Sequence, residues 1–218
     1  MIAAERLAAA YGERIIFEDV SFSLGQGRLG LICGPNGAGK STLLRILAGL
    51  ARPLRGSARP GGHSPGAVWL GHRPAVYPAL TVLENLEFWK TAGGMRHART
   101  DIWLERFGLA AFIHEPAGHL SRGLIQRLAL ARTFMGEASI LLLDEPTAAL
   151  DPVGEKALLD ALAHSLGRGA CVMLATHDPG AFAGLDPVSH VLGRSGLLSR
   201  GAWPPASEKS EKVWTCFA

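Results

Sequence analysis

The run GPNGAGKST at residues 34–42 has the residue types and spacing that hold phosphate groups. Glycine lets backbone N–H groups curl around an anion without a clash from a side chain. Lys40 can reach the β- and γ-phosphates of a nucleotide, and the Ser41 hydroxyl can ligate Mg²⁺. The run therefore predicts a nucleoside triphosphate site whose contacts come from Gly34, Pro35, Asn36, Gly37, Ala38, Gly39, Lys40, Ser41 and Thr42.

A second run, ILLLDEP at residues 140–146, places two carboxylates directly after a buried strand. In an open parallel sheet, ligands bind at the carboxyl ends of the strands. We expect Asp144 to hold Mg²⁺ through water and Glu145 to polarise the water that attacks the γ-phosphate. Two acids at a strand end can also be a solvated cap, but the phosphate loop upstream favours the catalytic interpretation.

Two further runs flank ILLLDEP along the chain. LSRGLIQRLALAR at 120–132 precedes it, and ATHDP at 175–179 follows it. Ser121 is a good N-cap residue, and its helix start could bind an anion. Because one phosphate cradle already exists, this second one makes sense if it serves the nucleotide of a neighbouring chain. An ordinary capped helix is the alternative. His177 can sense the γ-phosphate from the end of its strand, although a lone histidine there is usually structural.

Elements of two kinds must position these residues. Short apolar runs bounded by Gly, Pro or acids predict strands, and they alternate with helical stretches, which is typical of a mostly parallel sheet with helices on both faces. Two runs at the start predict antiparallel strands, the second with Ile16, Val20, Phe22 and Leu24 inward. Residues 41–50 predict a helix. Residues 80–136 are helix-like throughout and indicate an inserted lobe, and residues 201–218 predict a loosely attached tail.

Composition limits the class of protein. The chain has 218 residues, is 48% hydrophobic and carries a net charge of +3, which are globular values. No apolar run reaches the length of a membrane span, and no signal peptide is evident, so we expect a cytoplasmic location. Residues 40–100 contain nine Lys or Arg and two Glu. This local positive charge could bind phosphate, lipid headgroups or nucleic acid, or it could be an ordinary solvated surface. The three scattered cysteines imply no disulfide or zinc site.

The order of these runs resembles the nucleotide-binding subunits of ABC transporters, and the resemblance covers about residues 1–200. It implies an α/β fold, a P-loop NTPase (RecA-like) core with an N-terminal antiparallel β subdomain and an inserted α-helical lobe. It also implies that Tyr11 stacks on adenine, that Ser121 and Gly123 contact the partner's ATP, and that Asp151 lies in a loop linking two sites. Two chains would close head to tail as a homodimer around ATP and Mg²⁺.

The combination of LLRILAGLARP, LGHRP and LSRGLIQRLALAR further resembles the CcmA-type subunit, the ATPase of the haem exporter in bacterial cytochrome c maturation. His72 stands where the family usually has Gln, and we expect it to act in coupling, since imidazole is a poor Mg²⁺ ligand. Arg122, Leu124 and Thr147 also depart from the commonest residues.

The resemblance implies separate polytopic membrane subunits as partners and a peripheral place on the cytoplasmic face of the bacterial inner membrane, with no direct contact with nucleic acid. It leaves open another small ABC exporter, or a soluble ABC ATPase acting on nucleic acid or ribosomes. The LSRG and TH elements disfavour a GTPase or small-molecule kinase, and no guanine-reading NKxD run is present.

Overall fold

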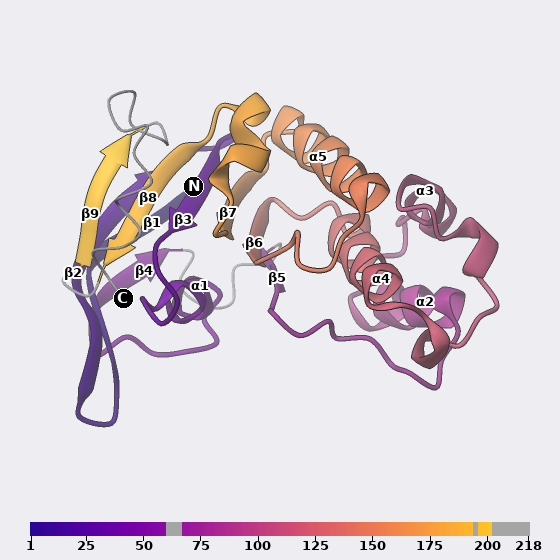
Figure 1. The fold of residues 1–218 in the computed structure, drawn as a ribbon, viewed down its shortest axis with the longest axis horizontal. Helices are drawn as coiled ribbons and strands as arrows, with labels where there is room; N and C mark the ends of the chain where they lie inside the picture. The colour runs from indigo at the N-terminus through magenta and orange to yellow at the C-terminus, as the bar shows by residue number, and fades with distance from the viewer. Residues whose placement is uncertain (60–66, 194–195, 202–218) are drawn as a thin grey trace.

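The computed structural model describes residues 1–59, 67–193 and 196–201. Its strands gather on one side and its helical lobe projects from the other (Figure 1). Within the described ranges no helix is long and apolar enough to cross a membrane. The larger sheet has six strands, in the spatial order β5 (Ala67–Leu70), β6 (Ile140–Asp144), β7 (Cys171–Ala175), β3 (Leu29–Cys33), β8 (Val188–Gly193) and β9 (Gly196–Gly201). All neighbours are parallel except β8 and β9.

The central strands of this sheet are buried on both faces. Side chains alternate between faces along a strand, so Leu29 and Leu31 of β3 join the core beneath the helical lobe. Ile32 of the same strand joins a second core beneath the smaller sheet. Two-sided burial explains why these strands read as continuous apolar runs. It also fixes the carboxyl ends of β3, β6 and β7 at one edge, where the motifs emerge.

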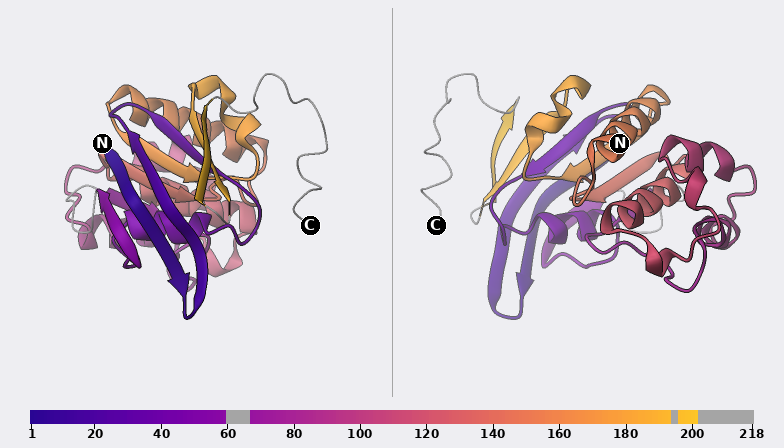
Figure 2. Two further views of the ribbon diagram at one scale, coloured as in Figure 1. Left: turned by 90° about the vertical axis from the view of Figure 1, so that its left-hand side faces the viewer. Right: turned by 45° about the vertical axis from the view of Figure 1, so that its right-hand side comes forward.

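The smaller sheet is antiparallel, in the order β2 (Arg14–Leu24), β1 (Ile2–Tyr11) and β4 (Arg55–Arg59). The hairpin of β1 and β2 extends beyond the body of the molecule (Figure 2). The predicted inward set of β2 is wrong at one position, because Phe17 is buried and Ile16 lies at the core margin. The register shifts between the Ala9–Phe17 and Leu7–Val20 pairs, and Asp19 there has φ 53°, so the alternation breaks.

Helices cover both faces of the parallel sheet, as the sequence predicts. α1 (Lys40–Leu47) packs beside β6 and β7 within the second core, and α5 (Pro152–Gly167) lies on the opposite face. The predicted 41–50 helix ends early, because Ala48 is the C-cap and Gly49 follows at φ 71°. A 3-10 helix, η3 (Pro179–Leu185), connects β7 to β8.

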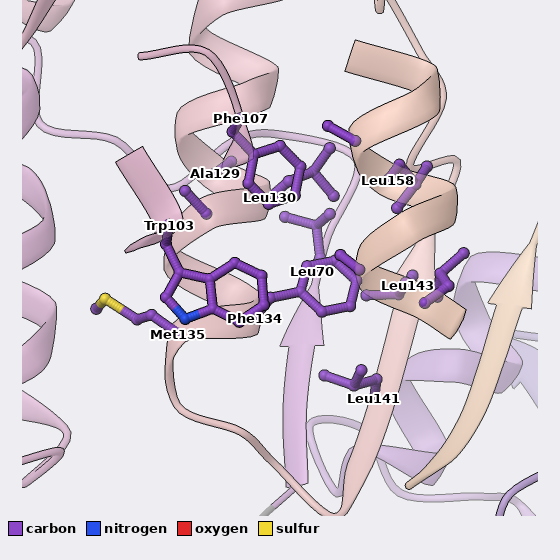
Figure 3. Close-up of a cluster of buried hydrophobic side chains, with 14 of the residues drawn as sticks. Leu70, Trp103, Phe107, Ala129, Leu130, Phe134, Met135, Leu141, Leu143 and Leu158 are labelled. Atoms are coloured by element: carbon purple, nitrogen blue, oxygen red, sulfur yellow. The ribbon is translucent and has the colours of Figure 1, made fainter. Parts of the chain in front are cut away.

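The predicted lobe comprises α2 (Val82–Ala92), α3 (Thr100–Arg106), α4 (Arg122–Met135) and the 3-10 turns η1 (Ala110–Phe112) and η2 (Ala117–His119). Its core is an aromatic group in which Trp103, Phe107 and Phe134 have ring centroids about 6 Å apart (5.9, 6.1 and 6.2 Å). Figure 3 shows this group continuing to Leu70, Leu141 and Leu143 of the sheet. The lobe is thereby held on the sheet through α4.

Three strands lack a signal that sequence reasoning could use. β4 reads RGSAR and β9 reads GLLSRG, and neither shows a sustained apolar alternation. β8 reads VSHVLG and follows a short turn. Each forms because a paired neighbour supplies its hydrogen bonds. The predicted tail at 201–218 lies outside the described residues, apart from Gly201.

Candidate active site

The phosphate loop connects β3 to α1 and depends on its glycines for its shape. Gly34, Gly37 and Gly39 have φ angles of 144°, 79° and 98°, in the region that other residues rarely adopt. A Cβ atom on Gly34 would lie 2.3 Å from the Leu192 carbonyl oxygen. One on Gly39 would lie 2.5 Å from Ile16 Cγ2. The loop is therefore closed against β8 on one side and β2 on the other, and no side chain fits at either place.

Lys40 opens α1 and turns its side chain back into the loop. Its ammonium donates to the Gly34 carbonyl at 2.8 Å and to the Pro35 carbonyl at 3.3 Å, and only 8% of the residue is exposed. The first turn of α1 contains no acidic residue. A fixed cation beside free helix N–H groups suits a phosphate, so the residues present fit the predicted nucleotide.

Asp144 and Glu145 stand where β6 ends, as predicted. Asp144 is the last residue of the strand and is 3% exposed. Glu145 turns the chain at φ 49°, and its N–H donates to the Ala175 carbonyl at 3.0 Å. This backbone bond ties the turn after β6 to the end of β7. Asp144 and Ser41 offer oxygen ligands in one cleft, which is the donor set that Mg²⁺ prefers.

His177 lies beside the second carboxylate. Its Nδ1 is 2.8 Å from Glu145 Oε2. The imidazole side chain is 69% exposed, whereas that of Glu145 is 17% exposed. The pair joins the ends of two neighbouring strands, β6 and β7. A histidine with one nitrogen held by a carboxylate keeps the other nitrogen available for a ligand.

A single cleft of about 830 Å³ collects most of the predicted residues. Tyr11 lines it from the end of β1, where 68% of the residue is exposed. His72 lines it from the loop after β5. Arg14, Ile15 and Ile16, which sequence reasoning did not select, also reach it. The other lining residues are Asn36, Gly37, Gly39, Lys40, Ser41, Thr42, Asp144 and Glu145.

Ser121, Gly123 and Asp151 do not line this cleft. Ser121 is exposed and caps α4, since its Oγ accepts from the Leu124 N–H at 3.3 Å. Gly123 packs beneath the Ala149 carbonyl, 2.9 Å from where a Cβ would lie. The predicted N-cap is confirmed. Because Ser121 and Gly123 sit on the helical lobe, the cleft of one chain does not contain its own serine-capped helix end.

Asp151 caps α5 and binds Arg127 of α4. The Arg127 guanidinium makes a two-pronged ion pair with the carboxylate, and the Gly154 N–H donates to Asp151 Oδ1 at 3.0 Å. The hydrogen bonds from Arg127 are the main cause that lowers the Asp151 pKa from its usual range, followed by that from Gly154. The sequence analysis did not predict this ion pair, although Arg127 belongs to the run LSRGLIQRLALAR that it singled out. The pair ties the serine-capped helix to the segment after the acidic strand.

The two cysteines within the described residues behave as apolar side chains. Cys33 precedes the phosphate loop and is 3% exposed. Burial raises the pKa of its thiol to about 11, a change that the nearby Lys40 charge only partly offsets. Burial likewise raises the pKa of Cys171. Both thiols therefore stay protonated and unreactive at neutral pH.

The family model described as ABC transporter matches residues 17–148, more than half of the chain. The chain belongs to the ATP-binding subunits of ABC transporters. Its relatives place it in the CcmA group. It is 46% identical over 192 residues to the cytochrome c biogenesis ATP-binding export protein CcmA of Rhizobium meliloti, covering 83% of this chain and 93% of the relative. The protein of the same name from Paramagnetospirillum magneticum is 41% identical over 187 residues, covering 80% and 86%.

Solved structures agree with the ABC transporter assignment. An ATP-binding subunit of an ABC transporter matches with a TM-score of 0.85 at 25% identity, covering 93% of this chain and 90% of the other. A bacterial ABC transporter cassette solved as a dimer matches with a TM-score of 0.81 at 25% identity, covering 94% and 100%. The expected fold class is confirmed, and the activity of this CcmA-type subunit is ATP hydrolysis coupled to transport.

Proposed function

We propose that two copies of this chain close head to tail around two Mg²⁺-ATP molecules. The observation that carries the proposal is the separation of the site into two parts. The cleft gathers Tyr11, the phosphate loop and the acidic strand end. Ser121 and Gly123 lie outside it, at an exposed helix start on the lobe. A second chain that places its own serine-capped helix against the cleft completes the set of phosphate contacts.

In this dimer each residue has a separate chemical task. The Lys40 ammonium neutralises charge on the β- and γ-phosphates, and the loop N–H groups orient them. Ser41 and Asp144 would hold Mg²⁺, which supplies neutralisation of charge on the transferring phosphoryl group. Glu145 accepts a proton from the attacking water, and His177 fixes the direction of that carboxylate through the Nδ1 contact at 2.8 Å. Tyr11 stacks on the adenine.

The partners we assign are polytopic membrane subunits that use the hydrolysis for a haem-handling step in cytochrome c maturation. The curated relatives carry the name of a cytochrome c biogenesis export protein, which supports the process. An exposed aromatic pair supports docking on the lobe, because Tyr77 and Phe88 are each 42% exposed and their ring centroids lie 4.7 Å apart. We place the chain on the cytoplasmic face of the bacterial inner membrane, held there by these partners.

Deleting the gene for this chain tests the haem assignment. We expect c-type cytochromes in the deleted cells to lose covalent haem staining while their apoproteins persist. Returning the chain should restore the staining, and a tagged copy should co-purify with a polytopic protein. Unchanged staining in the deleted cells would contradict the haem assignment and leave the ATPase assignment standing.

His72 gives a separate prediction about coupling. The residue lies in the cleft, and Arg132 of α4 donates to the Ala75 carbonyl at 3.1 Å in the segment just after it. Lobe movement would therefore reach His72 directly. We expect His72→Gln to keep the basal ATPase rate of the isolated chain within about threefold and to change the stimulation by the membrane subunits. The test measures the ATPase rate of the isolated chain and the rate with the membrane subunits present. If His72→Gln changed neither rate, the coupling role would be refuted.

A further inference from the structure

Arg14 is placed where a nucleotide bound beside Tyr11 would meet it. The two residues face each other across the tight turn of the β1–β2 hairpin, as the last pair in the strand register. Directly opposed residues of an antiparallel pair project to the same face of the sheet, with Cβ atoms about 5 Å apart. Both side chains line the cleft that contains the phosphate loop. The hairpin that carries them extends past the body of the molecule (Figure 2).

Arg14 is a cation in the cleft whose side chain is not paired with an acidic group of the described residues. Among the lining residues the permanent cations are Lys40 and Arg14. Lys40 is held deep in the loop by the Gly34 and Pro35 carbonyls. Arg14 is exposed, and its guanidinium forms no hydrogen bond or ion pair with the residues that the structure describes, although its backbone belongs to the β1–β2 ladder. By contrast, Arg55 on β4 of the same sheet pairs with Glu18 at 2.8 Å.

We infer that Arg14 is a nucleotide-binding residue, whose guanidinium contacts the phosphates of the nucleotide from the side opposite Lys40. A guanidinium suits this task, because it keeps its charge at all working pH values and presents several donors to phosphate oxygens. The inference rests on the proposed nucleotide site and adds one residue to it. The hairpin would then have two functions, since Tyr11 stacks on the adenine base and Arg14 binds the charged phosphates.

The test measures the dissociation constants of ATP and ADP for the full-length chain by titration calorimetry, without Mg²⁺ so that no turnover occurs. We expect Arg14→Ala to raise the dissociation constants of both nucleotides by about tenfold, because it removes one exposed charge-assisted contact. Arg14→Lys should recover part of that affinity, because it restores the charge. Raising the salt concentration should narrow the gap between wild type and Arg14→Ala.

Arg96→Ala is the matched control, because it removes an exposed arginine from the lobe, outside the cleft. It should leave both dissociation constants unchanged. Binding by Arg14→Ala within twofold of wild type would overturn the inference. A loss that is equal in the Lys and Ala variants and independent of salt would also overturn it, since it would indicate apolar packing. Either result leaves the nucleotide site itself intact, whereas absence of binding by the wild-type chain would remove the site.

Discussion

We expect Glu145→Gln to lower ATP turnover by about 10²–10⁴-fold, because an amide cannot accept the proton of the attacking water. The variant retains ATP binding, since Lys40, the phosphate loop and Asp144 are untouched. Dimers held by ATP should therefore accumulate, because hydrolysis no longer separates them. Gel filtration with and without Mg²⁺-ATP should show a shift from monomer to dimer that persists for the variant. Wild type should show it only transiently.

The pair between Glu145 and His177 supplies the control for this experiment. His177→Ala keeps the carboxylate but removes the contact at 2.8 Å that orients it. It should lower the turnover number strongly, yet less than Glu145→Gln does, with little change in the dissociation constant of ATP. Hydrolysis by Glu145→Gln at the wild-type rate would remove Glu145 from the role of base.

The second large effect concerns Ser121, which does not line the cleft of its own chain. Ser121→Asp preserves the helix, because Asp is as good an N-cap as Ser. It also places a carboxylate where we expect the partner's triphosphate, so repulsion should prevent the ATP-dependent dimer and abolish turnover. The dissociation constant of ATP for the monomer should stay the same, because the cleft does not include Ser121.

A mixing experiment shows whether the defect acts between chains. Lys40→Ala lacks its own phosphate contact but keeps an intact Ser121. Mixing it with Ser121→Asp forms dimers in which one site combines the good cleft and the good helix end, so ATPase activity should return in part. Ser121→Asn is the neutral control, because it caps the helix without a charge. No recovery on mixing, with normal folding of both variants, would refute the shared site.

The individual motifs were readable because each depends on local chemistry. A glycine loop between an apolar strand and a helix has few other uses, and two acids after a buried strand emerge at the ligand edge of a parallel sheet. Ser121 as an N-cap follows from residue type alone and is confirmed by its bond to Leu124. Local reasoning was weaker for β2. A register shift near Asp19 buries Phe17 in the core, where the sequence predicted Ile16.

The sequence by itself identified the phosphate loop and the order of motifs that marks an ABC transporter subunit, and it predicted that Asp144 holds Mg²⁺ and that Glu145 is the base. Only the tertiary structure decided which of these residues share a cleft. It placed Arg14 beside Tyr11, joined Arg127 to Asp151 and left Ser121 outside the cleft of its own chain. The physical reason is that cross-strand register and packing between distant segments depend on long-range contacts, and residue type and spacing along the chain do not record them.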